Sequence, residues 1–407
     1  MTTTTTTEMS NSVVTAYDRD YVDAFLTGRV WFELVDWQKP VGGDLKGSTI
    51  SQPVLEELEP ATAALSEGTD PEAVQMDDDH VDIVIVEQGN AIETTAFLSM
   101  TAYTNIEAAA ARAVGQNQAR SLDLVIRAVA TTGTLVMYPG AVAARIDLDT
   151  TTDKLTYAFI CELVSMAASM GIPPYEDGTY ATTIHPALFS DLTGMTEYKA
   201  VGEYSDPKLI YMGKPGVIGA GGRFKSERGM IGGLRLIEHR TAKLFLGAGT
   251  MAQAATTLDG GVAAGDTACD LVSASGVIVG DYITIAAGTA LEEQVRVLTV
   301  ATNALTIRGG GNKYTNFGFK YAHLTGVDVQ EAPNVAALPV FGPQSIRGRF
   351  VSETGMNGRA AVEWLSTRIP KRKMAHSWYW VGGFAAMQKW LIRGEVATTG
   401  NIYGSNR

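Results

Sequence analysis

Alternating apolar and polar positions predict strands in the first quarter of the chain. In the segment HVDIVIVEQG, Val81, Ile83 and Ile85 lie two positions apart, which returns their side chains to one face of a strand. The polar, proline-containing segment EGTDPEAVQMDDD precedes them. We therefore expect residues 43–95 to form a long two-stranded excursion around a polar loop.

Helical spacing follows, after a capping box formed by Thr104 and Glu107. The residues that recur at this spacing are Ile106, Ala109, Ala110, Ala113, Leu122, Val125 and Val129. They predict a spine helix over residues 104–132, roughly 42 Å long at the helical rise per residue. Gly133 is its expected stop.

A second helix is predicted from Asp153 to Met170. Its apolar side consists of Leu155, Phe159, Leu163, Met166 and Met170. Gly171 and Pro173 are expected to end it.

Residues 251–327 change to short alternating runs separated by glycine and asparagine, as in GDYITIAAGTALEEQVRVLTVATNALTIRGGG. This pattern is typical of antiparallel strands joined by hairpins. The flanking segments LRLIEHRTAKLFLG and GVDVQEAPNVAALPVF both look like strands of one domain. We therefore interpret 251–327 as a small all-β module inserted into a loop of that domain.

Composition narrows the class of protein. The 407 residues are enough for two or three domains, and the net charge of −12 argues against a dedicated nucleic-acid binder. Cys161 and Cys269 have neither metal-site spacing nor a disulfide framework around them. Neither a signal peptide nor a membrane-length apolar run is visible, so we expect a soluble intracellular product.

Charge is unevenly distributed. Residues 44–93 are strongly acidic and contain one basic residue, Lys46, whereas residues from 342 onward are basic. One interpretation is two solvated faces. The other is self-complementarity, in which the acidic part of one copy meets the basic part of the next. The charged candidates for such contacts are Glu67, Asp70, Asp77, Asp78, Asp79, Arg347, Arg349, Arg359, Lys371 and Arg372.

The glycine-rich segment GVIGAGGRFKSERGMIGGLRLIEH raises the possibility of a phosphate site. The Lys-Ser of a P-loop does not follow Gly221, and Phe224 stands where a dinucleotide fingerprint needs its third glycine. These glycines, including the contact candidates Gly221, Gly222 and Gly232, are better explained by tight turns that let loops crowd together.

Motifs for catalysis are missing from the sequence. It contains no H-E-x-x-H and no G-x-S-x-G. The acidic run Asp77–Asp79 with His80 could attract a divalent cation, which keeps a metal-dependent hydrolase as an alternative, but a solvated acidic turn explains it better. We expect no enzyme, no cofactor and no metal site.

Six segments occur in an order that resembles the major capsid proteins of tailed phages. They are LSEGTDPEAVQMDDDHVDIVIVEQGNAIETT, EDGTYATTIHPALFSDLTG, GKPGVIGAGGRFKSERGMIGGLRLIEH, VGDYITI, YAHLTGVDV and SWYWVGGFAAMQKWLIRGEVATTG. The resemblance runs from about residue 17 to the end, and its most specific block is Glu176–His239.

This resemblance implies an α+β chain with the Hong Kong 97-like fold, which herpesviruses share. The implied parts are an N-terminal arm (1–42), an extended β-loop (43–95), a peripheral domain with the spine helix (96–149 and 344–407), an axial domain (150–250 and 328–343) and an inserted β-domain (251–327).

The implied function is self-assembly into pentamers and hexamers of an icosahedral head around double-stranded DNA, which is packaged without sequence specificity. The implied locations are the virion capsid and, during assembly, the host cytoplasm, without membrane contact. Portal, scaffolding and decoration proteins are further implied partners. An encapsulin-like compartment shell remains an alternative, because encapsulins share the fold.

Overall fold

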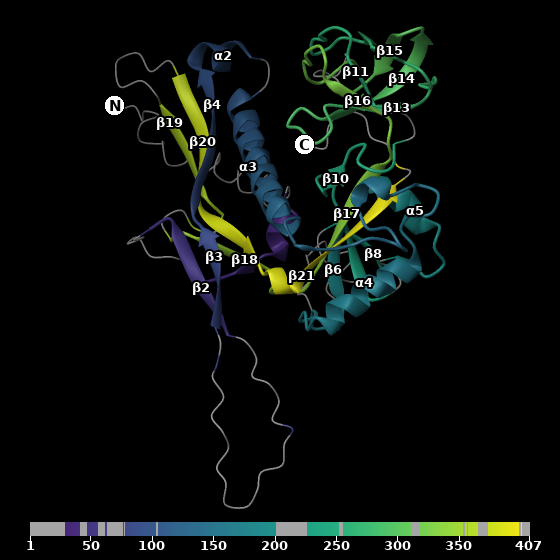
Figure 1. Ribbon diagram of the computed structural model, residues 1–407. Coiled ribbons are helices and arrows are strands. Elements are labelled where there is room, and N and C mark those ends of the chain that lie inside the picture. The colour runs from purple at the N-terminus through teal and green to yellow at the C-terminus, as the bar shows by residue number, and fades with distance from the viewer. Residues whose placement is uncertain are drawn as a thin grey trace, which may run out of the picture. The chain divides into compact units, whose positions relative to one another are not determined.

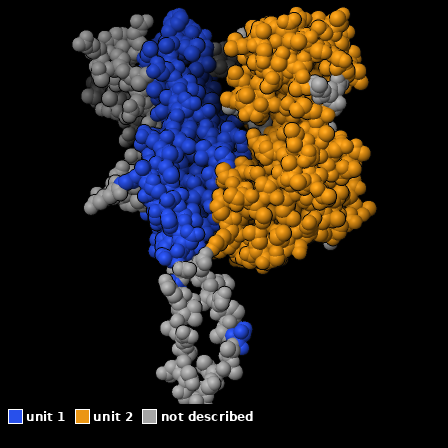
Figure 2. All heavy atoms as spheres, viewed as in Figure 1, with its two compact units in different colours: residues 1–129, 346–387 blue, residues 130–345, 388–407 orange. Residues whose placement is uncertain are grey.

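The structure is a computed structural model (Figure 1) that describes residues 29–40, 47–55, 62, 76, 78–102, 105–200, 226–251, 255–310, 317–352, 355, 357–364, 373–398 and 400. The chain divides into two compact units (Figure 2): residues 1–129 with 346–387 form unit 1, and residues 130–345 with 388–407 form unit 2. Within the described part of the chain, no helix is long and apolar enough to cross a membrane.

Unit 1 combines one long helix with a sheet. Its helical elements are η1 (Trp31–Leu34), α2 (Ala96–Thr101) and α3 (Ile106–Ala130). Its strands are β1 (Asp36–Trp37), β2 (Thr49–Leu55), β3 (Asp78–Val84), β4 (Val86–Thr95), β18 (Ile346–Phe350), β19 (Arg359–Trp364) and β20 (Lys373–Ala386). The sheet has the order β1-β18-β20-β19, and β4 also pairs with β20.

The expected two-stranded excursion over residues 43–95 is confirmed in part: β2 pairs antiparallel with β3, from Thr49 opposite Val84 to Leu55 opposite Asp78. Within HVDIVIVEQG, β3 ends at Val84 and β4 begins at Val86, so Ile85 lies between two strands. Strand β4 then leaves the excursion and pairs along β20.

The expected spine helix is confirmed as α3, with two differences. The side chain of Asn105 accepts a hydrogen bond from the backbone N–H of Ala108 at 3.2 Å, so Asn105 caps the helix; Thr104 lies outside the described residues. Its buried face includes polar Gln118 and Asp123 as well as Leu122, whereas Ala109 and Ala113 of the expected stripe are exposed. Alanines set the phase of a helix weakly, because they bury little area on either side.

Polar residues of α3 hold it in place within unit 1. The carboxylate of Asp123 accepts the backbone N–H groups of Val30 at 2.9 Å and Phe32 at 3.1 Å, which satisfies free donors at the start of η1. On the same helix, Asn117 accepts the indole N–H of Trp378 at 2.9 Å. The helix therefore binds both η1 and β20 through hydrogen bonds as well as apolar packing.

Unit 2 contains a larger mixed sheet. Its helical elements are η2 (Arg145–Asp147), α4 (Tyr157–Ser169), η3 (Pro186–Leu188), α5 (Phe189–Thr193) and η4 (Gln388–Trp390). The strands of the sheet are β5 (Leu135–Met137), β6 (Tyr180–Ile184), β7 (Lys199–Ala200), β8 (Glu227–Ile231), β9 (Leu234–Glu238), β10 (Leu244–Phe245), β17 (Asn334–Phe341) and β21 (Leu391–Thr398). Their order is β5-β21-β17-β6-β9-β8-β7, with β10 also paired to β17.

The second predicted helix is confirmed as α4, but it begins at Tyr157 rather than Asp153. Thr156 caps it by accepting the backbone N–H of Phe159, and Asp153 instead accepts the backbone N–H of Asp149 in the preceding turn. Gly171, at φ 70°, follows its end as expected. Phe159, Ile160 and Leu163 pack into the core against strands β6, β9, β17 and β21.

The boundaries of the two units differ from the domain boundaries expected from the sequence, and strand β21 shows the difference. Those boundaries group 344–407 with the spine helix, whereas β21 pairs along the whole of β17 and with β5 and lies in unit 2. Pairing between residues so far apart in the chain leaves no local signal, so the sequence pattern alone did not place this strand.

The inserted module is a closed barrel. Its strands, green in Figure 1, are β11 (Thr256–Thr257), β12 (Ala268–Asp270), β13 (Tyr282–Ile285), β14 (Glu293–Ala301), β15 (Ala304–Arg308) and β16 (Asp328–Gln330). The order is β11-β16-β13-β14-β15-β12, and the bridge between Leu258 and Leu271 joins the two ends. The barrel has its own apolar core, which includes Ile283, Val295, Ile307 and Phe319.

Buried amides connect the barrel to the sheet of unit 2. Asn334 and Gln294 bond each other through both amide groups, at 2.9 and 3.1 Å, and Asn334 also accepts the backbone N–H of Gly247 at 3.0 Å. A Cβ at Gly247 would lie 2.7 Å from the hydroxyl of Thr284, so the barrel approaches the sheet at backbone distance there. The joint is a packed, hydrogen-bonded contact.

Candidate assembly surfaces

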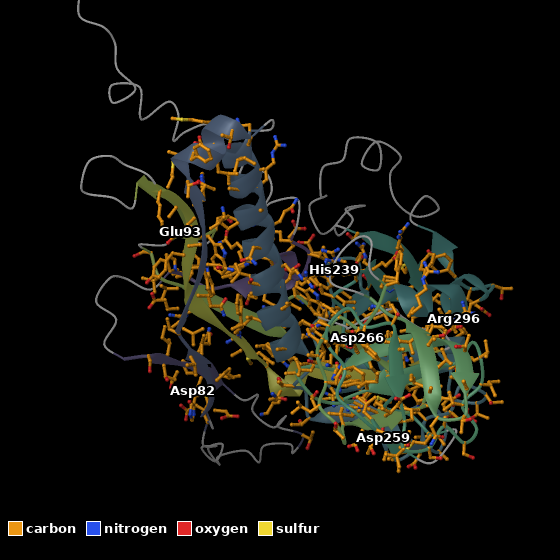
Figure 3. All side chains as sticks on the ribbon, turned by 90° about the horizontal axis from the view of Figure 1, so that it is seen from above. Asp82, Glu93, His239, Asp259, Asp266 and Arg296 are labelled. Atoms are coloured by element: carbon orange, nitrogen blue, oxygen red, sulfur yellow. The ribbon has the colours of Figure 1, made fainter. Side chains whose placement is uncertain are left out.

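The acidic candidates that the structure describes lie on the β2–β3 hairpin. Asp78 and Asp79 are exposed at the start of β3. They point to opposite faces of the ribbon, as neighbours in a strand do. Asp82, labelled in Figure 3, is also exposed and accepts the hydroxyl of Ser51. Glu67, Asp70 and Asp77 lie outside the described residues.

The base of this hairpin is held by a close backbone approach to β20. A Cβ at Gly383 would lie 2.1 Å from the carbonyl oxygen of Val84 and 3.0 Å from Cγ2 of Ile83, whose side chain is completely buried. Only a glycine at position 383 leaves room for this crossing. The hairpin is therefore anchored at Ile83 while its acidic positions remain exposed.

The basic candidates are only partly described. Arg347 and Arg349 lie on β18 and are half-buried. Arg359 begins β19, and Lys371 and Arg372 lie outside the described residues. Nearby, Lys373 at the start of β20 is 3.3 Å from Glu93 on β4, and both side chains are more than half exposed. The described residues therefore leave the expected acid–base contact between copies untested.

Of the glycine candidates, Gly221 and Gly222 lie outside the described residues, and Gly232 has a role within its own chain. It sits in the β8–β9 turn at φ 57°, a left-handed conformation that favours glycine. A Cβ there would contact Cys161 at 3.4 Å and Tyr157 at 3.5 Å, both on α4. Its conformation and packing thus explain this glycine without a contact between subunits.

Helix α2 carries an apolar surface that was not predicted from the sequence. Phe97, Leu98 and Met100 are 75%, 44% and 83% exposed, and the helix buries none of its residues. Thr95 caps it by accepting the backbone N–H of Leu98. The segment AFLSMT contains three large apolar residues in six positions. A segment of six residues is too short to reveal a helical period. Exposed apolar groups of this kind mark interaction surfaces.

The described residues do not form a metal site that would support the alternative of a metal-dependent hydrolase. Among them, no group of three or more His, Cys, Asp or Glu side chains could hold a metal ion. Asp78 and Asp79 diverge, as described above. Burial raises the pKa of the Cys269 thiol to about 12, so this cysteine remains protonated and unreactive at neutral pH.

An open pocket of about 460 Å³ lies beside β8 and β9, lined by Pro186, Ser226, Glu227, Arg228, Glu238, His239 and Arg240. Several of its polar side chains already have partners within unit 2. Arg228 forms an ion pair with Glu238, and Nδ1 of His239 lies 2.5 Å from the hydroxyl of Thr241. A nucleophile paired with a base is not evident among these lining residues.

Comparisons with known proteins find similarities in three-dimensional structure but none in sequence. No family model and no curated protein sequence matches the chain. The capsid of Ralstonia phage GP4 is similar at a TM-score of 0.58 and 11% identity, over 91% of this chain and 92% of that one. The capsid of cyanophage Pam1 is similar at a TM-score of 0.51 and 12% identity, over 92% of this chain and 94% of that one.

These similarities extend over nearly the full length of each chain, so they concern the whole architecture and not one shared motif. The α+β content that the sequence predicts is confirmed, and so is the resemblance at the level of the fold. The chain therefore has the fold of phage capsid proteins.

Proposed function

We propose that this chain is the major capsid protein of a tailed phage, and that its copies assemble into the pentamers and hexamers of an icosahedral head around double-stranded DNA. The observation that carries the proposal is the capsid fold, which accounts for 91% of this chain and 92% of its structural neighbour from Ralstonia phage GP4. The capsid matches suggest a structural role in the virion and not an enzymatic one.

In this proposal, unit 1 with the spine helix is the peripheral domain, and the large sheet of unit 2 is the axial domain. One sequence that tiles closed rings must make head-to-tail contacts whose rotation closes. The acidic hairpin and the basic C-terminal region supply opposite charges for such contacts. A net charge of −12 suits a container that encloses DNA without gripping it.

Portal, scaffolding and decoration proteins are proposed further partners, and the host cytoplasm is the proposed site of assembly. The encapsulin-like alternative predicts a shell that encloses protein cargo. The two functions can be separated by what a particle made in cells contains.

The first test is electron microscopy and sedimentation of the purified chain, alone and with its scaffolding protein. Closed shells, or rings of five or six copies, would support the proposal. A chain that remains a monomer or dimer under both conditions would contradict it. Particles from infected cells that contain protein cargo instead of DNA would favour the encapsulin-like function.

Salt dependence tests the nature of the contacts. If exposed charges provide register, shells should weaken as NaCl rises toward 1 M, where the screening length falls to about 3 Å. Shells that keep their stability in molar salt would instead point to buried apolar contacts, for which α2 is the exposed candidate.

A further inference from the structure

The outward face of the barrel carries two arginines directly opposite each other. Arg296 on β14 pairs in register with Arg308 on β15 and, on its other side, with Tyr282 on β13. Side chains that are directly opposite in this way point to the same side of a sheet, with Cβ atoms about 5 Å apart. The Arg308 guanidinium lies 4.5 Å from the ring centroid of Phe317. We call Tyr282, Arg296, Arg308 and Phe317 the arginine face.

Two like charges in this arrangement weaken a sheet unless an anion lies between them. Arg296 is exposed, and within the described part of the chain no carboxylate forms an ion pair with it. Next to the arginines on this outward surface, the hydroxyls of Thr299 and Thr306 are 2.5 Å apart, and the exposed carboxylate of Asp270 lies further along, opposite Ala304. Arginine flanked by aromatic rings is a composition typical of protein recognition surfaces.

The chain itself carries a surface of the opposite sign. On β3, Asp78, His80 and Asp82 occupy alternate positions and are all exposed, so they lie along one face of the β2–β3 hairpin. The two carboxylates are about 13 Å apart at the rise of an extended strand. A narrow ribbon with carboxylates along one face can lie flat on the surface of a sheet.

We propose that the arginine face binds the Asp78–Asp82 face of the β2–β3 hairpin of a second copy. The occupant follows from charge complementarity, since guanidinium and carboxylate groups form strong, geometrically specific pairs. By comparison, Arg347 and Arg349 are half-buried, so the barrel presents the more exposed arginines. This contact rests on the proposed function, because it requires copies that assemble.

Charge reversal tests the contact in assembled shells. Arg296→Glu with Arg308→Glu, and separately Asp78→Lys with Asp82→Lys, should each lower the NaCl concentration at which shells dissociate. Combining all four changes should restore it toward the wild-type value. Arg240 is an exposed arginine outside the barrel, elsewhere in unit 2. Arg240→Glu is the matched control and should leave the NaCl concentration for dissociation unchanged.

A cysteine pair identifies the partner. Shells that carry Arg296→Cys with Asp82→Cys should give a ladder of chain multiples on a denaturing gel after oxidation, whereas each single variant should not. Cross-links only within single chains would overturn the proposal. Shells that respond to reversal of the arginines but not of the aspartates would assign the face to another anionic partner and exclude the hairpin.

The same experiments distinguish failure of this contact from failure of the proposed function. If the wild-type chain forms no shells with its scaffolding protein, the proposed function fails. If shells form and neither reversal changes their salt stability, the shell function stands and this contact is refuted.

Discussion

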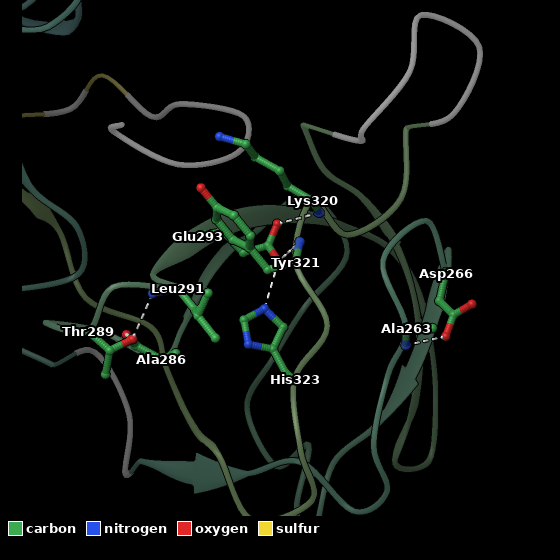
Figure 4. Close-up of polar contacts among 9 residues, drawn as sticks. All are labelled: Ala263, Asp266, Ala286, Thr289, Leu291, Glu293, Lys320, Tyr321 and His323. Atoms are coloured by element: carbon green, nitrogen blue, oxygen red, sulfur yellow. Dashed lines mark hydrogen bonds and ion pairs between the residues drawn. The ribbon is translucent and has the colours of Figure 1, made fainter. Parts of the chain in front are cut away.

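The carboxylate of Glu293 lies 2.7 Å from Nε2 of His323, and both side chains are buried inside the barrel (Figure 4). The same carboxylate accepts the backbone N–H groups of Lys320 at 2.8 Å and Tyr321 at 3.2 Å. One acidic side chain on β14 thus fixes the position of the segment 317–323, whose Phe319 is completely buried in the barrel core.

Replacing Glu293 with Gln should destabilise the barrel. Glutamine has nearly the same size, but its amide NH₂ would face at least one backbone donor where an acceptor is required. We expect a loss of roughly 1–3 kcal/mol in the free energy of unfolding, measured by urea denaturation. Asp259→Asn, at an exposed position of the same barrel, should change it by less than about 0.5 kcal/mol. Equal effects of the two variants would contradict the role of Glu293.

Stability should fall on mild acidification because of His185. Burial lowers the pKa of His185 to about 4, and its Nδ1 accepts the backbone N–H of Ala187 at 3.1 Å, which requires an unprotonated nitrogen. Between pH 6.5 and pH 4 the unfolded chain binds a proton at this site that the folded chain does not. Stability should therefore decrease as pH falls through that window, by about 3 kcal/mol at most, and level off below it.

The variant His185→Asn separates this effect from general acid sensitivity. Asparagine can still cap the helix but does not titrate. Unfolding free energies measured from pH 7 to pH 4 should have a shallower slope than those of the wild type. Parallel profiles for the two proteins would exclude His185 as the source.

Gly383→Ala should loosen the hairpin at its base. The added methyl group meets the carbonyl oxygen of Val84 at 2.1 Å, so β3 and β20 must separate, at a cost of roughly 1–3 kcal/mol. Hydrogen exchange of β3 amides should accelerate. Gly194→Ala, where the nearest atom is 3.8 Å away, is the control; similar acceleration in both variants would mean that crowding at Gly383 is not the cause.

Gly232→Val should reduce shell formation by destabilising the subunit. A β-branched residue at φ 57° is strained by roughly 1–3 kcal/mol, and its side chain would press against α4. Gly232→Asn should be milder, since asparagine tolerates this conformation. A Gly232→Val monomer with wild-type thermal stability that still fails to assemble would restore Gly232 as a contact between subunits.

Substitutions on α2 should separate assembly from folding. Because Phe97 and Met100 are 75% and 83% exposed, changing both to Ser should alter the unfolding free energy of the monomer only slightly. If α2 is covered in the shell, assembly followed by light scattering should be slower. Assembly at the wild-type rate would show that this helix stays exposed in the particle.

The sequence predicted those elements of the fold that the residue pattern of a single segment determines. Residues 104–132 and 153–170 gave α3 and α4 because apolar spacing is local, and alternation identified the hairpin and the β module. The closure of the barrel through Leu258 and Leu271 was not predictable, because pairing between distant strands leaves no mark in either segment.

Buried polar contacts and candidate surfaces were harder to predict for the same reason. Glu293 lies in an alternating strand and resembles any solvent-facing acid until residues about thirty positions further along donate to it. Arg296 and Arg308 became a pair only through the register of β14 with β15. The acidic run at Asp77–Asp79 was conspicuous in the sequence, yet Asp78 and Asp79 diverge on the folded strand.

The strands that lead into and out of the barrel are neighbours: Leu244 and Phe245 of β10 pair with Ala336 and Val335 of β17. A chain without the barrel would need only a short turn between these strands to keep the sheet intact. A closed barrel also brings no unpaired strand edge with it. In evolutionary terms, such a module is a unit that a single recombination event can insert or remove without disturbing the sheet. Under the proposed function, such an exchange would alter one surface of the particle and leave the rest of the subunit unchanged.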